Sequence, residues 1–427
     1  MSGRRFGNGP PRPQGVASAA AYRGAAIRAG FDVPPPGERR YVPREVVLDV
    51  ASTMSSESLA ALARHHGLTL LESVTVRLTG RTLHRLHVDD GRSVPTLVRA
   101  LADDARIAAA QPNYLYALQD VGAQRTEPPR ASSPQWVVDK LHLDEAHELA
   151  TGKQVVVAVI DTAIDAAHSC LVGAIRGADT FDAVGDANRA AGNEGRPDKH
   201  GTAMAGAIAA HCDLVGVAPR ARLLSVRAFA PGTSTEAPAL RIVKAIDWAV
   251  THGARVINMS FAGPHDPMLD GPITAAYRKG VVLVAAAGNQ GPVSPPQYPA
   301  AYPQVIAVTA TDADDHLFDH AGRGPHIAVA APGVDILAPI PDGAIEFVTG
   351  TSIAAAHVSG LAALLIERQP SLGPDDIRRI LEESAVRLRS NPDRGDVGAG
   401  LVDAYQSLRA LGLSAAASRT VPALTTH

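Results

Sequence analysis

The chain has 427 residues, a formal net charge of -3 and a mean hydropathy of +0.02, and 46% of its residues are hydrophobic. These values are typical of a globular protein of two or three domains, and the charge gives no sign of nucleic acid or a membrane surface as a partner. The most apolar stretch, GVVLVAAAG at 280–288, is too short to span a bilayer.

Residues 1–40 are rich in glycine, proline and arginine. This composition favours a disordered segment, because it offers little apolar surface to bury. The segment lacks the apolar core of a signal peptide. Either the protein stays inside the cell or it is exported through a signal that precedes this sequence.

Residues 41–118 have the patterns of a small α+β domain. Alternating and helical periodicities predict the order βαββαβ, a ferredoxin-like arrangement with two helices on one face of an antiparallel sheet. The expected strands are 44–50, 68–75, 81–88 and 106–118, and the expected helices are 56–67 and 93–104. Residues 119–134 have no periodicity and contain several prolines and serines, so we expect an exposed linker that a protease can reach.

From 135 to 412 the pattern changes to short apolar strands separated by helical segments. Such runs are typical of strands buried on both faces, and they predict a doubly wound, mainly parallel α/β sheet with helices on both sides. The expected strands are 153–162, 221–229, 254–260, 280–288 and 304–311, with helices at 201–211, 237–253 and 270–280. Residues 413–427 are expected to form a flexible tail. Functional sites in these sheets form outside the carboxyl ends of the strands.

Three polar residues stand at such ends. Asp161 ends the first strand, while His200 and Ser352 open helices. Taken singly, each has an ordinary explanation, as a turn former, a residue at a helix start or a helix cap. Together they offer a nucleophile, a base and a carboxylate that orients the base. Asn289 follows another strand and is either a turn residue or a donor to an oxyanion.

Several motifs occur in the order found in one enzyme family. The stretches VIDTAID, HGTAMAG, NMSFAG, AAAGN and GTSIAAAHVSG, spread over 136–411, resemble those of subtilisin-like serine proteases, the subtilases. The resemblance implies a triad of Asp161, His200 and Ser352, with Asn289 as oxyanion donor. It also implies peptide-binding edges at Ser260, Phe261, Ala262, Gly263, Ala287 and Gly288.

The resemblance implies a monomeric serine endopeptidase that acts on peptides or proteins and needs no cofactor for catalysis. Residues 41–118 resemble the family's propeptide, which assists folding and inhibits the enzyme, so the chain would cleave itself between Leu118 and about Pro134. The alternative is a weak or inactive scaffold that binds peptides, although no triad residue is lost. A nucleotide-binding protein is disfavoured because the glycine fingerprints are missing.

Two departures from the family pattern bear on the site. Ala356 stands where proline is usual, which restores a backbone N–H and predicts a more relaxed helix start under Ser352. Cys170 and Cys212 flank a position where many members bind calcium, and the loop at 210–219 offers only Asp213 as a carboxylate. The resemblance therefore suggests a disulfide in place of a metal. The alternative is two reduced thiols, and calcium binding stays open.

Overall fold

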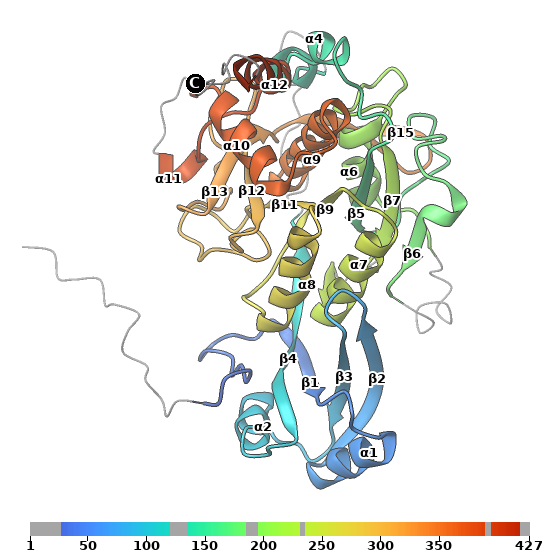
Figure 1. The fold of residues 1–427 in the computed structure, drawn as a ribbon, viewed down its shortest axis with the longest axis vertical. Coiled ribbons are helices and arrows are strands. Elements are labelled where there is room, and N and C mark those ends of the chain that lie inside the picture. Colours follow the sequence, from blue (N-terminus) through green and yellow to red (C-terminus); the bar gives the residue numbers. More distant parts are fainter. Residues whose placement is uncertain (1–26, 120–134, 185–194, 231–234, 389–393, 419–427) are drawn as a thin grey trace, which may run out of the picture.

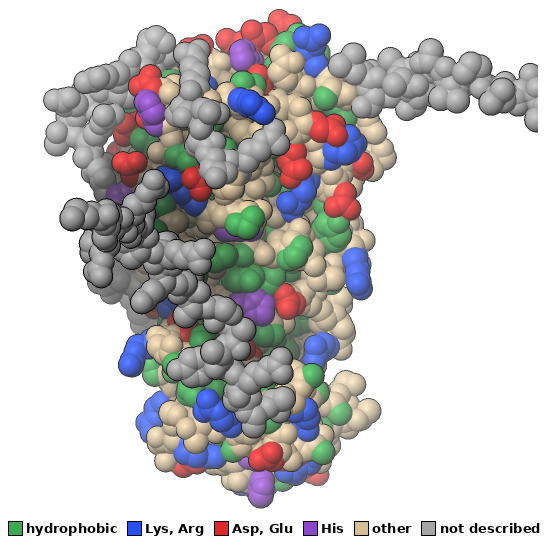
Figure 2. Space-filling view, turned by 90° about the vertical axis from the view of Figure 1, so that its left-hand side faces the viewer, with side chains coloured by type: hydrophobic (Ala, Val, Ile, Leu, Met, Phe, Trp, Pro, Cys, Tyr) green, Lys and Arg blue, Asp and Glu red, His purple; other side chains and the backbone are tan. Residues whose placement is uncertain are grey.

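The computed structural model describes residues 27–119, 135–184, 195–230, 235–388 and 394–418. The N-terminal domain lies below a larger α/β domain (Figure 1). Figure 2 shows acidic and basic side chains intermixed over the face that it presents. The expected linker, apart from Gln119, lies outside the described residues.

The N-terminal domain has the predicted order of elements: β1 (Tyr41–Val50), α1 (Ser56–His65), β2 (Leu68–Val76), β3 (Arg81–Val88), α2 (Val94–Leu101) and β4 (Ile107–Leu118). The sheet is antiparallel in the order β4-β1-β3-β2. Successive side chains of β1 alternate between two cores. Val46 and Leu48 pack with α1 and α2, whereas Val47 joins a core shared with the larger domain.

Residues just before β1 are ordered, so the prediction of disorder over 1–40 is wrong for 28–40. Phe31 is 6% exposed and forms a bridge with Ala110, and the Tyr114 hydroxyl donates a hydrogen bond to Asp32. A single buried aromatic side chain anchors this segment, and average composition does not reveal such an anchor. Residues 1–26 lie outside the described part of the chain.

The larger domain contains a seven-stranded sheet in the order β13-β12-β11-β9-β5-β7-β6, and all its pairs are parallel. This confirms the predicted fold class. The strands are β5 (Val156–Asp161), β6 (Thr180–Asp182), β7 (Arg222–Arg227), β9 (Val256–Met259), β11 (Val282–Ala286), β12 (Val305–Thr311) and β13 (Ile327–Pro332). The sequence analysis did not identify β6, β13 or the hairpin of β14 (Ile336–Ile340) and β15 (Ala344–Val348).

Helices cover both faces of this sheet (Figure 1). Val157 and Val159 of β5 share a core with α6 (Lys199–Ala209) and α9 (Thr351–Arg368). Ala158 and Ile160 face α7 (Ala239–Thr251) and α8 (Pro267–Arg278). Among the described residues, the other helices are α3 (Val137–Lys140), α4 (Leu143–His147), α10 (Pro374–Ser384), α11 (Arg394–Val397) and α12 (Ala404–Ser418), with a 3-10 turn at Gly177–Asp179.

Among the predicted boundaries that differ from the structure are the start of the C-terminal tail and the start of the helix expected from 237. The tail expected from 413 begins inside α12, which continues to Ser418; residues 419–427 lie outside the described part. The helix expected from 237 begins at Ala239, because Glu236–Pro238 form the short strand β8. Their backbone groups pair with β4, and this pairing with a distant strand overrides the local helical pattern.

Strand β4 connects the two domains. Its last residues pair antiparallel with β8 on one side and with β10 (Phe261–Ala262) on the other. The rest of the sheet rests on α7, where Lys244 forms an ion pair with Glu72 at 2.9 Å and Asp247 accepts from the N–H of Leu78 at 2.8 Å. The N-terminal domain is therefore docked through backbone pairing, apolar contact and charge.

A carboxyl group is buried in this interface. Asp266 is 0% exposed and caps α8, accepting from the backbone N–H of Met268 at 2.9 Å. It also accepts from the side-chain amide of Gln111 of β4 at 2.6 Å. Burial raises the pKa of Asp266 from its ordinary value of 3.8 to about 7, and the nearby charge of Asp32 acts in the same direction.

We expect docking of the N-terminal domain to weaken as pH rises. The docked state binds the Asp266 proton more tightly, so the cost of ionising it grows between pH 3.8 and about 7 and is largest above about 7. In full-length Ser352→Ala protein, the melting temperature should fall from about pH 5 to about pH 8.5. Adding Asp266→Asn should flatten this fall, whereas Asp213→Asn, at an exposed site, should leave it unchanged. Equal pH dependence in all three proteins would contradict the assignment.

Candidate active site

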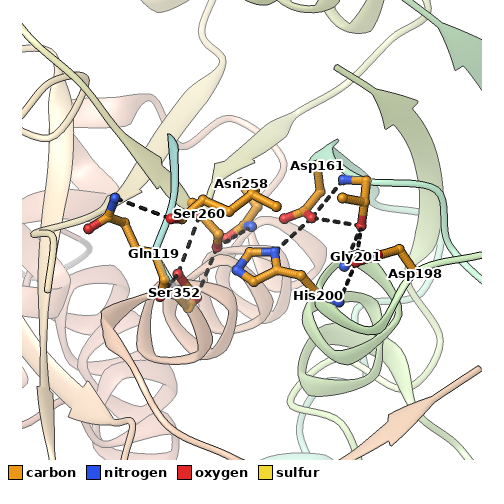
Figure 3. Close-up of polar contacts among 10 residues, drawn as sticks. Gln119, Asp161, Asp198, His200, Gly201, Asn258, Ser260 and Ser352 are labelled. Carbon is orange, nitrogen blue, oxygen red and sulfur yellow. Dashed lines mark hydrogen bonds and ion pairs between the residues drawn. The ribbon is translucent and has the colours of Figure 1, made fainter. Parts of the chain in front are cut away.

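At the carboxyl end of β5, the predicted base lies beside the carboxylate that is expected to orient it. Asp161 and His200 are 0% and 2% exposed, and His200 Nδ1 lies 2.7 Å from Asp161 Oδ1 (Figure 3). The same oxygen accepts from the backbone N–H of Thr162 at 2.7 Å. Asp198 caps α6 by accepting from the N–H of His200 at 3.0 Å. The orientation of the imidazole is thus fixed by two contacts of His200, one through its backbone N–H and one through its ring nitrogen.

Ser352 is the second residue of α9, and this helix begins without a side-chain cap. Helix capping therefore does not account for its hydroxyl. The Oγ atom lies 3.3 Å from the carbonyl oxygen of Gln119 and 3.3 Å from that of Ser260. In Figure 3 the ring of His200 lies between Asp161 and Ser352. The structure brings together the three residues that the sequence singled out.

A buried polar network supports the backbone of Ser352. The hydroxyl of Ser260 donates to the carbonyl oxygen of Ser352 at 2.9 Å, and Asn258 Nδ2 donates to that hydroxyl at 2.9 Å. Ser359 of α9 donates to Asn258 Oδ1 at 3.0 Å. The carbonyl oxygen of Ser352, four residues before Ala356, therefore accepts a hydrogen bond from outside its own helix. Sequence reasoning missed Asn258 and Ser359, although a polar residue inside a buried strand signals a hydrogen-bonded role.

The side-chain amide of Asn289 is oriented by Thr351. Asn289 Oδ1 accepts from the N–H of Thr351 at 3.0 Å and from its hydroxyl at 2.9 Å. Its Nδ2 is then directed to the carbonyl oxygen of Gln119, at 2.6 Å. Gly350 leaves the space for this contact, since a Cβ there would lie 2.8 Å from Asn289 Nδ2 and 3.1 Å from the Gln119 oxygen. Sequence reasoning missed the roles of Gly350 and Thr351.

The predicted peptide-binding edges lie beside the end of β4, with one exception. Phe261 and Ala262 pair with Leu118 and Ala117. Gly263 lies against the ring of Tyr116, since a Cβ added to Gly263 would be 2.6 Å from a ring atom. Gly288 lies beside the side chain of Gln119. Ala287 instead uses its N–H within the sheet, donating to Val308 at 2.9 Å. The opposite edge, formed by Thr235 and β8, was not foreseen, and no sequence signal marks it.

Cys170 and Cys212 are joined by a disulfide, with Cα atoms 4.7 Å apart. The bond lies in a small apolar cluster with Ala210 and Leu214. Within the described ranges, no group of three or more His, Cys, Asp or Glu side chains is placed to hold a metal ion.

Comparison with known proteins identifies the family. Residues 152–405 match the model of the subtilase family, peptidase S8. The chain is 32% identical over 361 residues to a thermophilic serine proteinase of Bacillus sp. (strain AK1), covering 82% of this chain and 83% of that protein. It is 34% identical over 284 residues to subtilisin Savinase of Lederbergia lenta, covering 65% of this chain and 100% of that protein. The chain belongs to the subtilase family and is a subtilisin-like serine protease.

A solved structure supports the fold. The crystal structure of fervidolysin from Fervidobacterium pennivorans, described as a keratinolytic enzyme related to subtilisin, aligns with a TM-score of 0.72 at 24% identity. The alignment covers 88% of this chain and 62% of fervidolysin. In the sequence comparison, fervidolysin is 32% identical over 345 residues, and these span 47% of its length. The shared architecture is the subtilisin-like parallel sheet flanked by helices.

The geometry of Asn289 predicts the effect of removing it. With Asn289 acting as the oxyanion donor, Asn289→Ala should lower kcat by roughly 10² to 10³ with little change in KM, because an oxyanion is bound only in the transition state; this is the magnitude found for such a donor in subtilisin. Steady-state kinetics on a peptide substrate measures this effect. Thr351→Ser keeps the N–H and hydroxyl that orient Asn289 and should retain kcat within a few-fold. An effect of Asn289→Ala on KM alone would reduce Asn289 to a substrate contact.

The disulfide should contribute to stability. It closes a segment with a sequence separation of 42, for which the loss of entropy in the unfolded chain gives about 4 kcal/mol. The Cys170→Ala/Cys212→Ala variant should lose about this much free energy of unfolding in denaturant titration. If the disulfide replaces a metal, calcium will not restore the loss. Two titratable thiols in the unreduced, unfolded wild type would refute the bond itself.

Proposed function

We propose that this protease is an endopeptidase made as a precursor, that Asp161, His200 and Ser352 are its triad, and that it cuts its own chain after Gln119. One observation carries the proposal. The carbonyl oxygen of Gln119 lies 2.6 Å from Asn289 Nδ2 and 3.3 Å from Ser352 Oγ. A carbonyl group that contacts both a nucleophile and an oxyanion donor is in the position of a bond to be cleaved.

The reaction follows from these positions. His200 takes the proton of Ser352 while Oγ attacks the carbonyl carbon of Gln119, and the oxygen gains negative charge beside Asn289. His200 then gives the proton to the nitrogen of Asp120, and the bond to that nitrogen breaks. Water, deprotonated by His200, then attacks the acyl-enzyme; the bond to Ser352 Oγ breaks, His200 returns the proton to Oγ, and the Gln119 carboxylate is released. Asp161 keeps the proton of the neutral imidazole on Nδ1 and stabilises the imidazolium.

We infer that the N-terminal domain remains an inhibitor after the cut. Cleavage after Gln119 changes none of the contacts along β4, where Leu118 pairs with Phe261 and its N–H donates to Thr235 at 3.0 Å. The apolar core under Val47 and the ion pair between Glu72 and Lys244 also persist. A second peptide cannot occupy the same backbone edges until β4 leaves.

Substrates of the released enzyme would be extended peptide segments of proteins, bound as β4 is bound, by an enzyme acting as a monomer without a cofactor in catalysis. The disulfide favours an oxidising compartment, so we propose that the enzyme works outside the cytoplasm. Among the described residues, no helix has the length and hydrophobicity needed to cross a membrane.

Self-processing can be tested by mass. Purified wild-type protein should have lost residues 1–119, giving a chain that begins at Asp120, whereas Ser352→Ala should keep its full mass. Adding wild-type enzyme to Ser352→Ala should produce the same cut, which controls for misfolding of the variant. A wild type that stays intact and does not cleave casein would instead support the inactive scaffold. Equal spontaneous cleavage of both proteins would also contradict the proposal.

A further inference from the structure

The side-chain amide of Gln119 has a polar partner at each end, one from Asn289 and the other from the backbone of β4. Gln119 is 6% exposed. Its Oε1 atom accepts from the backbone N–H of Asn289 at 3.0 Å. Its Nε2 atom donates to the carbonyl oxygen of Ala117 at 3.1 Å and also to the carbonyl oxygen of Leu118 at 3.4 Å. Both ends of the amide therefore have partners of the matching polarity.

The surroundings fix the space for this amide. A Cβ on Gly288 would lie 3.7 Å from Gln119 Oε1 and 3.1 Å from Cγ of Gln297. Gln297 is 1% exposed, and its Nε2 atom donates to the carbonyl oxygen of Pro295 at 2.7 Å, a contact within the larger domain. Its Oε1 atom accepts from Arg40 Nη1 at 3.0 Å, but Arg40 belongs to the part of the chain that the proposed cut releases. In the released enzyme the contact with Pro295 is the one that limits rearrangement of this wall around a side chain of different shape.

Asn289 contacts the glutamine twice, through its backbone N–H to the side-chain oxygen and through Nδ2 to the backbone carbonyl oxygen. Binding of the amide therefore fixes the residue that stabilises the oxyanion relative to the carbonyl that becomes it. From this geometry we propose that the protease selects substrates with glutamine immediately before the scissile bond. The inference rests on the proposed function, because it takes Gln119 as the residue before the cut.

Replacing Gln119 by methionine or by glutamate, which have similar shapes, separates the contributions of the Oε1 acceptor and the Nε2 donor. Methionine has a similar length but neither donor nor acceptor of comparable strength, so the N–H of Asn289 would lose its partner. Glutamate keeps an acceptor for that N–H, but its second oxygen would face the carbonyl oxygens of Ala117 and Leu118, which are also acceptors. Protonation of the carboxylate supplies the missing donor. Discrimination against glutamate should therefore decrease at low pH.

The test uses the processed wild-type enzyme and peptides of the sequence Tyr-Ala-Leu-Gln-Asp-Val-Gly, which copies residues 116–122. We expect kcat/KM for glutamine to exceed that for methionine by about tenfold, the effect of hydrogen bonds lost from a buried site. At about pH 8 glutamate should be cleaved at least about tenfold more slowly than glutamine, and the ratio of glutamate to glutamine should rise as pH falls toward about 4.3. The ratio cancels the enzyme's own pH dependence.

A second measurement follows self-processing in the full-length chain. Gln119→Met and Gln119→Glu should slow the cut after residue 119 by similar factors, and only the Glu variant should recover at low pH. Leu118→Met, a change of similar volume at the neighbouring position, should process at nearly the wild-type rate. Slowing that is equal for the changes at 118 and 119 would overturn the inference.

The possible failures are distinct. Methionine or phenylalanine peptides cleaved as fast as glutamine, by an enzyme that hydrolyses casein, would overturn glutamine selection and leave the proposed endopeptidase intact. Absence of hydrolysis of every peptide and of casein would overturn both. A glutamate-to-glutamine ratio that does not change with pH would contradict the role assigned to the Nε2 donor.

Discussion

The pairing of strand β4 with β8 on one side and β10 on the other determines how the N-terminal domain meets the candidate active site. The end of β4 is hydrogen-bonded on both sides, to β10 and to β8, so its position along the crevice is set by backbone register. The register places the carbonyl oxygen of Gln119 2.6 Å from Asn289 Nδ2 and beside the hydroxyl of Ser352 (Figure 3). A shift by one residue would turn the opposite face of the strand toward the enzyme. The contacts with the Gln119 side chain depend on the same register.

The parallel sheet brings the candidate catalytic residues to the edge that the end of β4 meets. Because parallel strands end at one edge, Asp161 at the end of β5, Ser260 after β9 and Asn289 after β11 reach the same crevice. Helices α6 and α9 begin there, bringing His200 and Ser352 in their first turns. Helix N-termini carry partial positive charge, which favours the negative charge that develops on the substrate oxygen. The polar network through Asn258 and Ser359 keeps the start of α9 joined to β9.

In the proposed precursor, the interface between the domains must hold the inhibitory peptide in place and still allow its release. Apolar packing of the β-sheet against α7 and α8 supplies the area, while Gln111 and Asp266 form a polar contact in its interior. A buried carboxyl group with a raised pKa stabilises docking only while it keeps its proton. The ion pair of Glu72 and Lys244 at the edge is partly exposed and contributes little by comparison.

Local patterns in the sequence predicted the elements of the N-terminal domain and five strands of the parallel sheet, and they singled out the candidate catalytic side chains. Buried runs such as 156–161 predict parallel strands because both faces of each strand must be apolar, and the order of motifs assigns Asp161, His200, Ser352 and Asn289. The sequence could not show β8, the anchoring of Phe31 or the double contact between Asn289 and Gln119. These features depend on hydrogen bonds and burial between residues far apart in the chain. Such contacts leave no periodic pattern, since only tertiary packing brings the partners together, within the N-terminal domain for Phe31 and between the domains for the others.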